Sequence, residues 1–219
     1  MHNTHNTPLR PYAIQWTQLL TEIVETPPLH AKWLNTLSYL ENCGARKIAT
    51  CEHPTKVKEE MLKHAAEEFR HAHYLKSQIC RISEEKLENY SANMMLGSFE
   101  TLHYLNALDI YTCQHLKKKA GLSKAAIKEA AYILVTYAIE LRASELYPVY
   151  HEVLRLKKSP VAVKSILLEE EEHLAEMEKE LANVRDGKKL LEYVCQAEGI
   201  LCGQWIQALQ KNMAALRPL

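Results

Sequence analysis

Two short segments of the sequence repeat a carboxylate and an imidazole at a spacing that suits metal binding. Glu68 and His71 are three residues apart, as are Glu170 and His173. Side chains at i and i+3 share one face of a helix, and both pairs fall on apolar stripes that predict the buried side. A buried carboxylate is costly unless it is paired, hydrogen-bonded or bound to metal. Two inward Glu-x-x-His pairs, each joined by an inward Glu of a neighbouring helix, are typical of a dinuclear metal site in a four-helix bundle.

The helices of an all-α domain are expected to position these pairs. The chain has 219 residues, enough for one domain with a sizeable core. It contains only 6 glycines, and long stretches are rich in Ala, Leu, Glu, Lys and Gln, which favour helices. We find no run of alternating Val, Ile and Thr that would indicate a sheet. The sequence therefore predicts a single all-α domain.

Breaks in the apolar pattern divide the chain into helices. Four bundle helices are expected at about residues 29–49, 55–82, 124–156 and 160–184. Short breaks around Pro54 and Pro160 predict two antiparallel hairpins, which a long crossover joins. Additional helices are expected before, between and after the hairpins, at about residues 11–25, 97–119 and 188–213. Residues 1–9 are expected to be disordered.

A further carboxylate lies on the inward face of the helix before the first Glu-x-x-His pair. Glu41 interrupts an apolar stripe, as Glu68 does on the next helix. Counted from the turn near residue 53, Glu41 lies about twelve residues before and Glu68 about fifteen residues after. At about 1.5 Å per residue, the two carboxylates are within roughly one turn of the same level. Glu41 is therefore a predicted ligand.

The second hairpin offers two candidates for the corresponding carboxylate. Glu140 and Glu145 both lie on apolar stripes of the helix before Pro160. They are about 140° apart around a helix of ~3.6 residues per turn. Because each has its own apolar stripe, periodicity leaves both candidates open.

The combined pattern resembles that of the ferritin-like diiron-carboxylate superfamily. A lone Glu followed by a Glu-x-x-His pair occurs twice, over roughly residues 30–80 and 125–182. Within that superfamily, residues 66–71 (AEEFRH) and 139–145 (IELRASE) look closest to the tRNA isopentenyladenosine hydroxylases. The resemblance implies a ferritin-like four-helix bundle with extra helices, and it favours Glu140 over Glu145 as a ligand. The predicted metal ligands are Glu41, Glu68, His71, Glu140, Glu170 and His173.

The predicted donor set suits iron. Four carboxylates and two imidazoles without a thiolate favour iron or manganese over zinc. The resemblance implies two iron ions, with manganese or a mixed pair as alternatives, that together deliver two electrons to dioxygen. We therefore predict an oxygen-activating oxidase or hydroxylase, of the monooxygenase type. It would act on a small-molecule or modified-nucleoside substrate, tRNA being one option, and would need an external electron donor.

Two other functions are compatible with the same residues. A ferroxidase or iron-storage protein would use the metal site without an organic substrate and would assemble into a large homo-oligomer. A metal-free helical interaction module would instead pair the Glu and His side chains with Arg or Lys. The metal content of the purified protein separates the last alternative from the other two.

The bulk composition narrows the function classes further. Lys plus Arg equals Asp plus Glu, at 27 each, which gives no general attraction to nucleic acid or to an anionic membrane. The six cysteines form no Cys-x-x-Cys motif, which argues against a zinc ribbon or a rubredoxin-type iron centre. We find no signal-peptide core and no apolar run near the ~20 residues of a membrane helix. A cytoplasmic protein without a membrane partner is expected.

Other polar side chains have simpler interpretations. Glu100 and His103 form a third Glu-x-x-His match, but it has no mate and is interpreted as structural or exposed. His64, one turn before Glu68, is interpreted as a core histidine, with a hydrogen bond to a ligand as the alternative. Three tyrosines of the helix before Pro160 are expected to pack in the core, with lining of the substrate pocket as the alternative: Tyr137, Tyr147 and Tyr150.

Overall fold

The computed structural model describes residues 8–53, 55–119 and 123–216, and within these ranges it is helical without a strand. Its α-helices are α1 (Ala13–Glu25), α2 (Pro27–Cys51), α3 (Glu59–Gln78), α4 (Ser98–Lys119), α5 (Lys124–Leu156), α6 (Lys164–Leu181) and α7 (Gly187–Leu216). The all-α prediction is therefore confirmed for this part of the chain. Pro54 and residues 1–7, to which two of the predictions refer, lie outside the described residues. Leu9, in the remainder of the segment predicted to be disordered, packs against the core.

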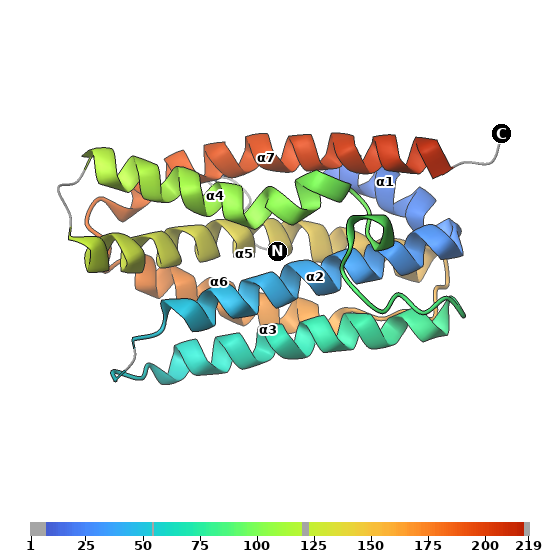
Figure 1. Cartoon of the computed structure of the whole chain (residues 1–219), viewed down its shortest axis with the longest axis horizontal. Helices are drawn as coiled ribbons and strands as arrows, with labels where there is room; N and C mark the ends of the chain where they lie inside the picture. The colour runs from blue at the N-terminus through green and yellow to red at the C-terminus, as the bar shows by residue number, and fades with distance from the viewer. Residues whose placement is uncertain (1–7, 54, 120–122, 217–219) are drawn as a thin grey trace.

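The four helices that contain the predicted ligands pack as two pairs (Figure 1). α2 packs along α3 and α5 packs along α6, and contacts of α2 with α5 and of α3 with α6 join the two pairs. α4 belongs to the crossover between the pairs and packs on α7 and α5, while α1 packs on α5 and α2. Because α1, α4, α6 and α7 all contact α5, that helix buries residues on most of its faces.

Local hydrogen bonds set the helix ends. The Ser123 side chain caps α5 by accepting the backbone N–H of the residue three positions later, at 3.2 Å. α3 begins four residues after its predicted start, because His53 Nδ1 accepts the backbone N–H groups two and three residues later and stabilises a turn there. α6 also begins four residues after its predicted start, behind a turn in which Ser159 Oγ accepts a backbone N–H.

Apolar side chains of all seven α-helices fill two clusters of the core. One cluster contains Trp16, Trp33 and Trp205, each at most 1 % exposed. The other is centred on α5, where Leu134 and Ala138 are completely buried. Among the described helices, none combines the length and the apolar character needed to cross a membrane.

Candidate metal centre

Four helices bring all six predicted ligands together in the interior of the protein. α2, α3, α5 and α6 contribute them to two groups, in each of which one potential ligand atom per residue lies within 4.8 Å of the others. The first group consists of His64, Glu68, Glu140 and His173. The second group consists of Glu41, Glu68, His71 and Glu170. Because Glu68 belongs to both, the two groups adjoin.

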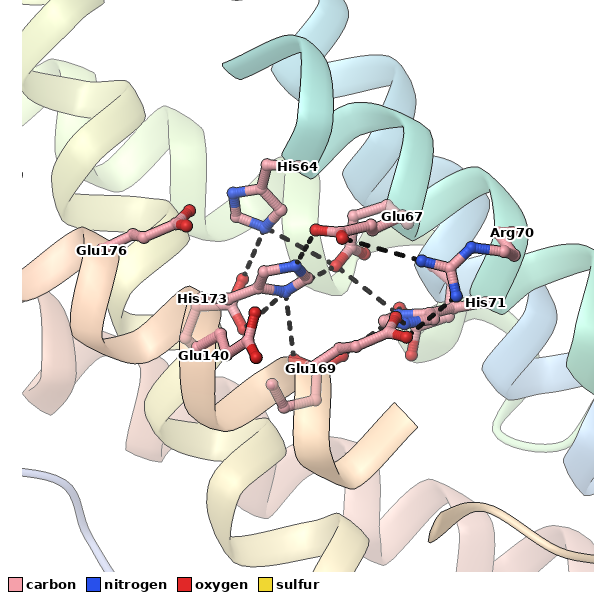
Figure 2. Close-up of polar contacts among 12 residues, drawn as sticks. His64, Glu67, Arg70, His71, Glu140, Glu169, His173 and Glu176 are labelled. Carbon is pink, nitrogen blue, oxygen red and sulfur yellow. Dashed lines mark hydrogen bonds and ion pairs between the residues drawn. The ribbon is translucent and has the colours of Figure 1, made fainter. Parts of the chain in front are cut away.

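The first group places two imidazoles beside two carboxylates (Figure 2). His64 Nε2 is 3.1 Å from Glu140 Oε1 and 3.6 Å from Glu68 Oε1. His173 Nδ1 is 3.5 Å from the same Glu68 oxygen. The ring centroids of His64 and His173 are 4.0 Å apart, and all four side chains are buried. Both imidazoles therefore face the same small volume.

The second group combines one imidazole with three carboxylates. His71 Nδ1 is 3.2 Å from Glu170 Oε1. It is 3.8 Å from Glu41 Oε2 and 3.9 Å from Glu68 Oε1. Gly44 of α2 leaves room for this arrangement, because a Cβ atom there would lie only 3.2 Å from Glu68 Oε2. The absence of a side chain at this position thus allows a carboxylate to fit between α2 and α3.

Five buried polar atoms of these groups have no hydrogen-bond partner among the described residues. They are Nδ1 of His64, His71 and His173, Oε2 of Glu140 and Oε1 of Glu170. Such atoms are rare in proteins, and each costs about 1–3 kcal/mol. Four of them approach each other in pairs, His173 Nδ1 with Glu140 Oε2 at 4.0 Å and His71 Nδ1 with Glu170 Oε1 at 3.2 Å. A cation bound at each pair would satisfy these donor atoms, so the residues present fit a pair of metal ions.

A second layer of carboxylates holds two of the imidazoles from the outside. Glu67 Oε2 accepts a hydrogen bond from His173 Nε2 at 2.9 Å, and Glu169 Oε2 accepts one from His71 Nε2 at 2.6 Å. In the neutral imidazole, these bonds place the proton on Nε2 and leave Nδ1 free to bind a metal. Arg70 connects the two outer carboxylates, since its guanidinium is 2.9 Å from Glu169 and 3.7 Å from Glu67 (Figure 2).

The metal-free site retains protons. Burial, together with the charges of neighbouring carboxylates, raises the pKa of Glu68 to about 8 and that of Glu140 well above its usual range. Burial lowers the pKa of His71 and of His173, but hydrogen bonds to carboxylates and the charges of those carboxylates outweigh this effect. The pKa of His71 is thereby raised to about 11 and that of His173 to about 9. A metal ion entering the site would displace these protons.

The structure places Glu140, and not Glu145, in the site. Glu145 lies on another face of α5, where it accepts the backbone N–H of Tyr12 at 2.7 Å and pairs with Arg142. Arg142 Nη2 is also 2.7 Å from Glu198 Oε2, and both of these side chains are buried. Glu145 therefore belongs to a network that ties α1 and α7 to α5.

His64 belongs to the first ligand group, although the sequence interpretation treated it as a core histidine. Its Nε2 reaches the first group and its Nδ1 has no partner among the described residues, so it is not a satisfied core histidine. The available signal was its spacing, because a residue four positions before Glu68 shares its helix face. Glu100 and His103, the third match, lie on α4 and belong to neither group.

Comparisons of the chain with protein-family models, with curated proteins and with solved structures find no match. The class of the protein therefore follows from its own structure. It is an all-helical protein in which four helices enclose two adjoining groups of carboxylates and imidazoles that can hold metal ions.

Proposed function

We propose that the chain holds two iron ions within a ferritin-like bundle and is an oxygen-activating oxidase or hydroxylase of an organic substrate. The observation that carries this proposal is the pairing of unsatisfied donor atoms, His173 Nδ1 with Glu140 Oε2 and His71 Nδ1 with Glu170 Oε1. The two members of each pair come from different helices. A cation at each pair would therefore satisfy the buried atoms and link the helices.

Charge and donor type support the same proposal. The four carboxylates of the two groups carry four negative charges when ionised, which two divalent cations neutralise. Carboxylate and imidazole donors suit iron or manganese, and neither group, as described, includes a thiolate. Bound there, two ferrous ions would supply electrons for the reduction of dioxygen.

The side chains of the site have separate tasks in this proposal. Glu68 belongs to both groups, so it would help to hold both ions. Glu67 and Glu169 orient the imidazoles of the opposite helices through their Nε2–H groups. Apart from the half-buried Glu41, the predicted ligands are buried, which strengthens the electrostatic interactions within the site.

The metal content of the protein tests the proposal. The full chain would be reconstituted anaerobically with ferrous ion, desalted and analysed for iron, and oxygen uptake would then be recorded. We expect two iron ions per chain, and a clear loss in Glu68→Ala and in Glu170→Ala. Glu178→Ala is the matched control, because Glu178 lies on the exposed face of α6. Equal iron content in all four proteins would exclude this assignment of the ligands.

A further inference from the structure

All three tryptophans of the chain gather in one buried cluster of the core. The ring centroids of Trp16 and Trp205 are 5.3 Å apart, those of Trp33 and Trp205 are 5.8 Å apart, and those of Trp16 and Trp33 are 6.2 Å apart. They come from α1, α2 and α7. Indole rings are among the most easily oxidised side chains, so this cluster can carry an electron vacancy.

Tyrosines connect the cluster to the metal ligands. The Tyr150 ring lies edge-on to Trp33, with centroids 6.3 Å apart. Tyr147 lies three residues earlier on α5, hence within one turn on the same face, and its hydroxyl donates a hydrogen bond to Glu41. Both tyrosines are at most 2 % exposed. A series of oxidisable rings thus extends from the tryptophans, through Tyr150 and its helix neighbour Tyr147, to a carboxylate of the second ligand group.

The other end of the series reaches a surface cavity. Tyr104 of α4 stacks on Trp205, with centroids 5.3 Å apart. Tyr104 also lines a cavity of about 570 Å³ between α4 and α7, beside Gln204 and Lys211. A small reductant, or a side chain of a protein that carries electrons, would contact the series at this point.

Each tyrosine in the series has a proton acceptor. This matters because a phenol loses its proton when it loses an electron. Tyr150 Oη is 2.7 Å from His30 Nε2, and burial lowers the pKa of His30 to about 4, so that this imidazole is neutral and able to accept a proton at pH 7. The Tyr147 hydroxyl has the carboxylate of Glu41, and the Tyr104 hydroxyl has that of Glu198. A buried hydroxyl needs a hydrogen-bond partner in any case, but here each partner is a carboxylate or an imidazole, which can also take up the proton.

We propose that Tyr104, Trp205, Trp33, Tyr150 and Tyr147 form a route for single electrons between the α4–α7 cavity and the metal centre. The role of the inner end rests on the proposed function. For each electron that a metal centre there would accept, Tyr147 loses one electron and its hydroxyl proton moves to the hydrogen-bonded Glu41. Electrons from Tyr150, Trp33, Trp205 and Tyr104 then refill the vacancies in turn, and a one-electron reductant in the cavity restores Tyr104. Each phenol proton returns as its radical is reduced, so the reductant loses one electron and the centre gains one.

Flash photo-oxidation of the full chain without metal tests the route independently of the metal centre. A photogenerated ruthenium(III) polypyridyl complex, with persulfate as the final acceptor, would oxidise the protein. Transient absorption and EPR would follow tryptophanyl and tyrosyl radicals. Because all three tryptophans lie in the cluster, any tryptophanyl signal reports on it. The Tyr104→Phe variant serves as the starting protein, the parent for the other variants. Without its hydroxyl, residue 104 cannot reduce the oxidised tryptophan in place of Tyr150.

In this parent we expect the tryptophanyl signal to decay as a tyrosyl signal grows. Both changes should be slower in D₂O, because the oxidation of Tyr150 transfers its proton to His30. Adding Tyr150→Phe or His30→Gln should prolong the tryptophanyl signal and remove that tyrosyl growth. Adding Tyr111→Phe, at a position 48 % exposed, should change neither.

Failure to form a tryptophanyl radical, or equal decay in all variants without a solvent isotope effect, would overturn the proposal. The solvent isotope effect is measured with Tyr150 and His30 unchanged. It therefore tests the proposal even when the Tyr150→Phe or His30→Gln variant folds poorly. Iron content, measured separately, shows whether the proposed function itself fails.

Discussion

The metal-free chain should lose stability as the pH rises from 6.5 towards 8. The pKa of His173 is raised from 6.5 to about 9 in the folded protein, so over this range the folded state keeps a proton that the unfolded chain releases. The pKa of Glu68, raised from 4.5 to about 8, has the same consequence. Because the folded state binds more protons than the unfolded state, the free energy of unfolding falls with rising pH.

The size of the expected fall in the free energy of unfolding follows from the number of protons that the folded state retains. Each one lowers the free energy of unfolding by about 1.4 kcal/mol per pH unit. Between pH 6.5 and pH 8, His173 alone therefore accounts for about 2 kcal/mol. In a chain of 219 residues, that change lowers the melting temperature by about 4–8 °C. Glu68 adds to this fall, most strongly at the lower end of the range.

Thermal melts of chelator-treated protein across this pH range provide the assay, with Glu68→Gln as the control. The amide of the variant is neutral at every pH, so its stability should decline less steeply, by up to about 1.4 kcal/mol per pH unit. Ferrous ion should stabilise the wild-type protein more at pH 8 than at pH 6.5, because binding releases the retained protons. A metal-free melting temperature that is constant or rises with pH, with the same slope in Glu68→Gln, would refute this reasoning.

Three further predictions concern single side chains. His64→Gln should empty the first ligand group alone and halve the iron content found by elemental analysis; unchanged content would make His64 a packing residue. Glu169→Gln should weaken metal binding by about 10- to 100-fold in a chelator competition, because His71 loses the carboxylate that orients it, and unchanged affinity would contradict that role. Arg142→Met should lower the free energy of unfolding by about 3–5 kcal/mol in denaturant titrations, because Glu198 stays buried without its cation. Its iron content per folded chain should equal that of the wild type, and a loss of iron would show that the network also supports the site.

The helix faces that carry the Glu-x-x-His pairs were predictable because the i, i+3 spacing determines a shared face whatever surrounds the helix. Counting from the turn also placed Glu41 near the level of Glu68, and both carboxylates lie within 3.9 Å of His71 Nδ1. The start of α3 was less predictable, because it depends on the local hydrogen bonds of the His53 side chain rather than on apolar periodicity.

Periodicity could not separate Glu140 from Glu145 because α5 has no broad exposed face. α1, α4 and α7 cover the side that would face solvent in a bundle of only four helices, so both apolar stripes are buried. The sequence nevertheless contains a signal that distinguishes them. Arg142 lies three residues before Glu145, whereas no Lys or Arg lies three or four residues from Glu140 on either side. A buried carboxylate without a cation on its own helix has to be satisfied from elsewhere.

The repeated unit of the site is one residue longer than the Glu-x-x-His pair. Each copy reads Glu-Glu-x-x-His, and its first carboxylate serves the other copy: Glu67 holds His173, and Glu169 holds His71. The orientation of each imidazole therefore depends on the opposite helix, and Arg70 couples the two outer carboxylates. The polar contacts between α3 and α6 thus do more than close the bundle, since any shift of one helix along the other would misplace both imidazoles at once. This exchange explains why a run of four glutamates, which alone would suggest an exposed face, contains one ligand and one supporting residue.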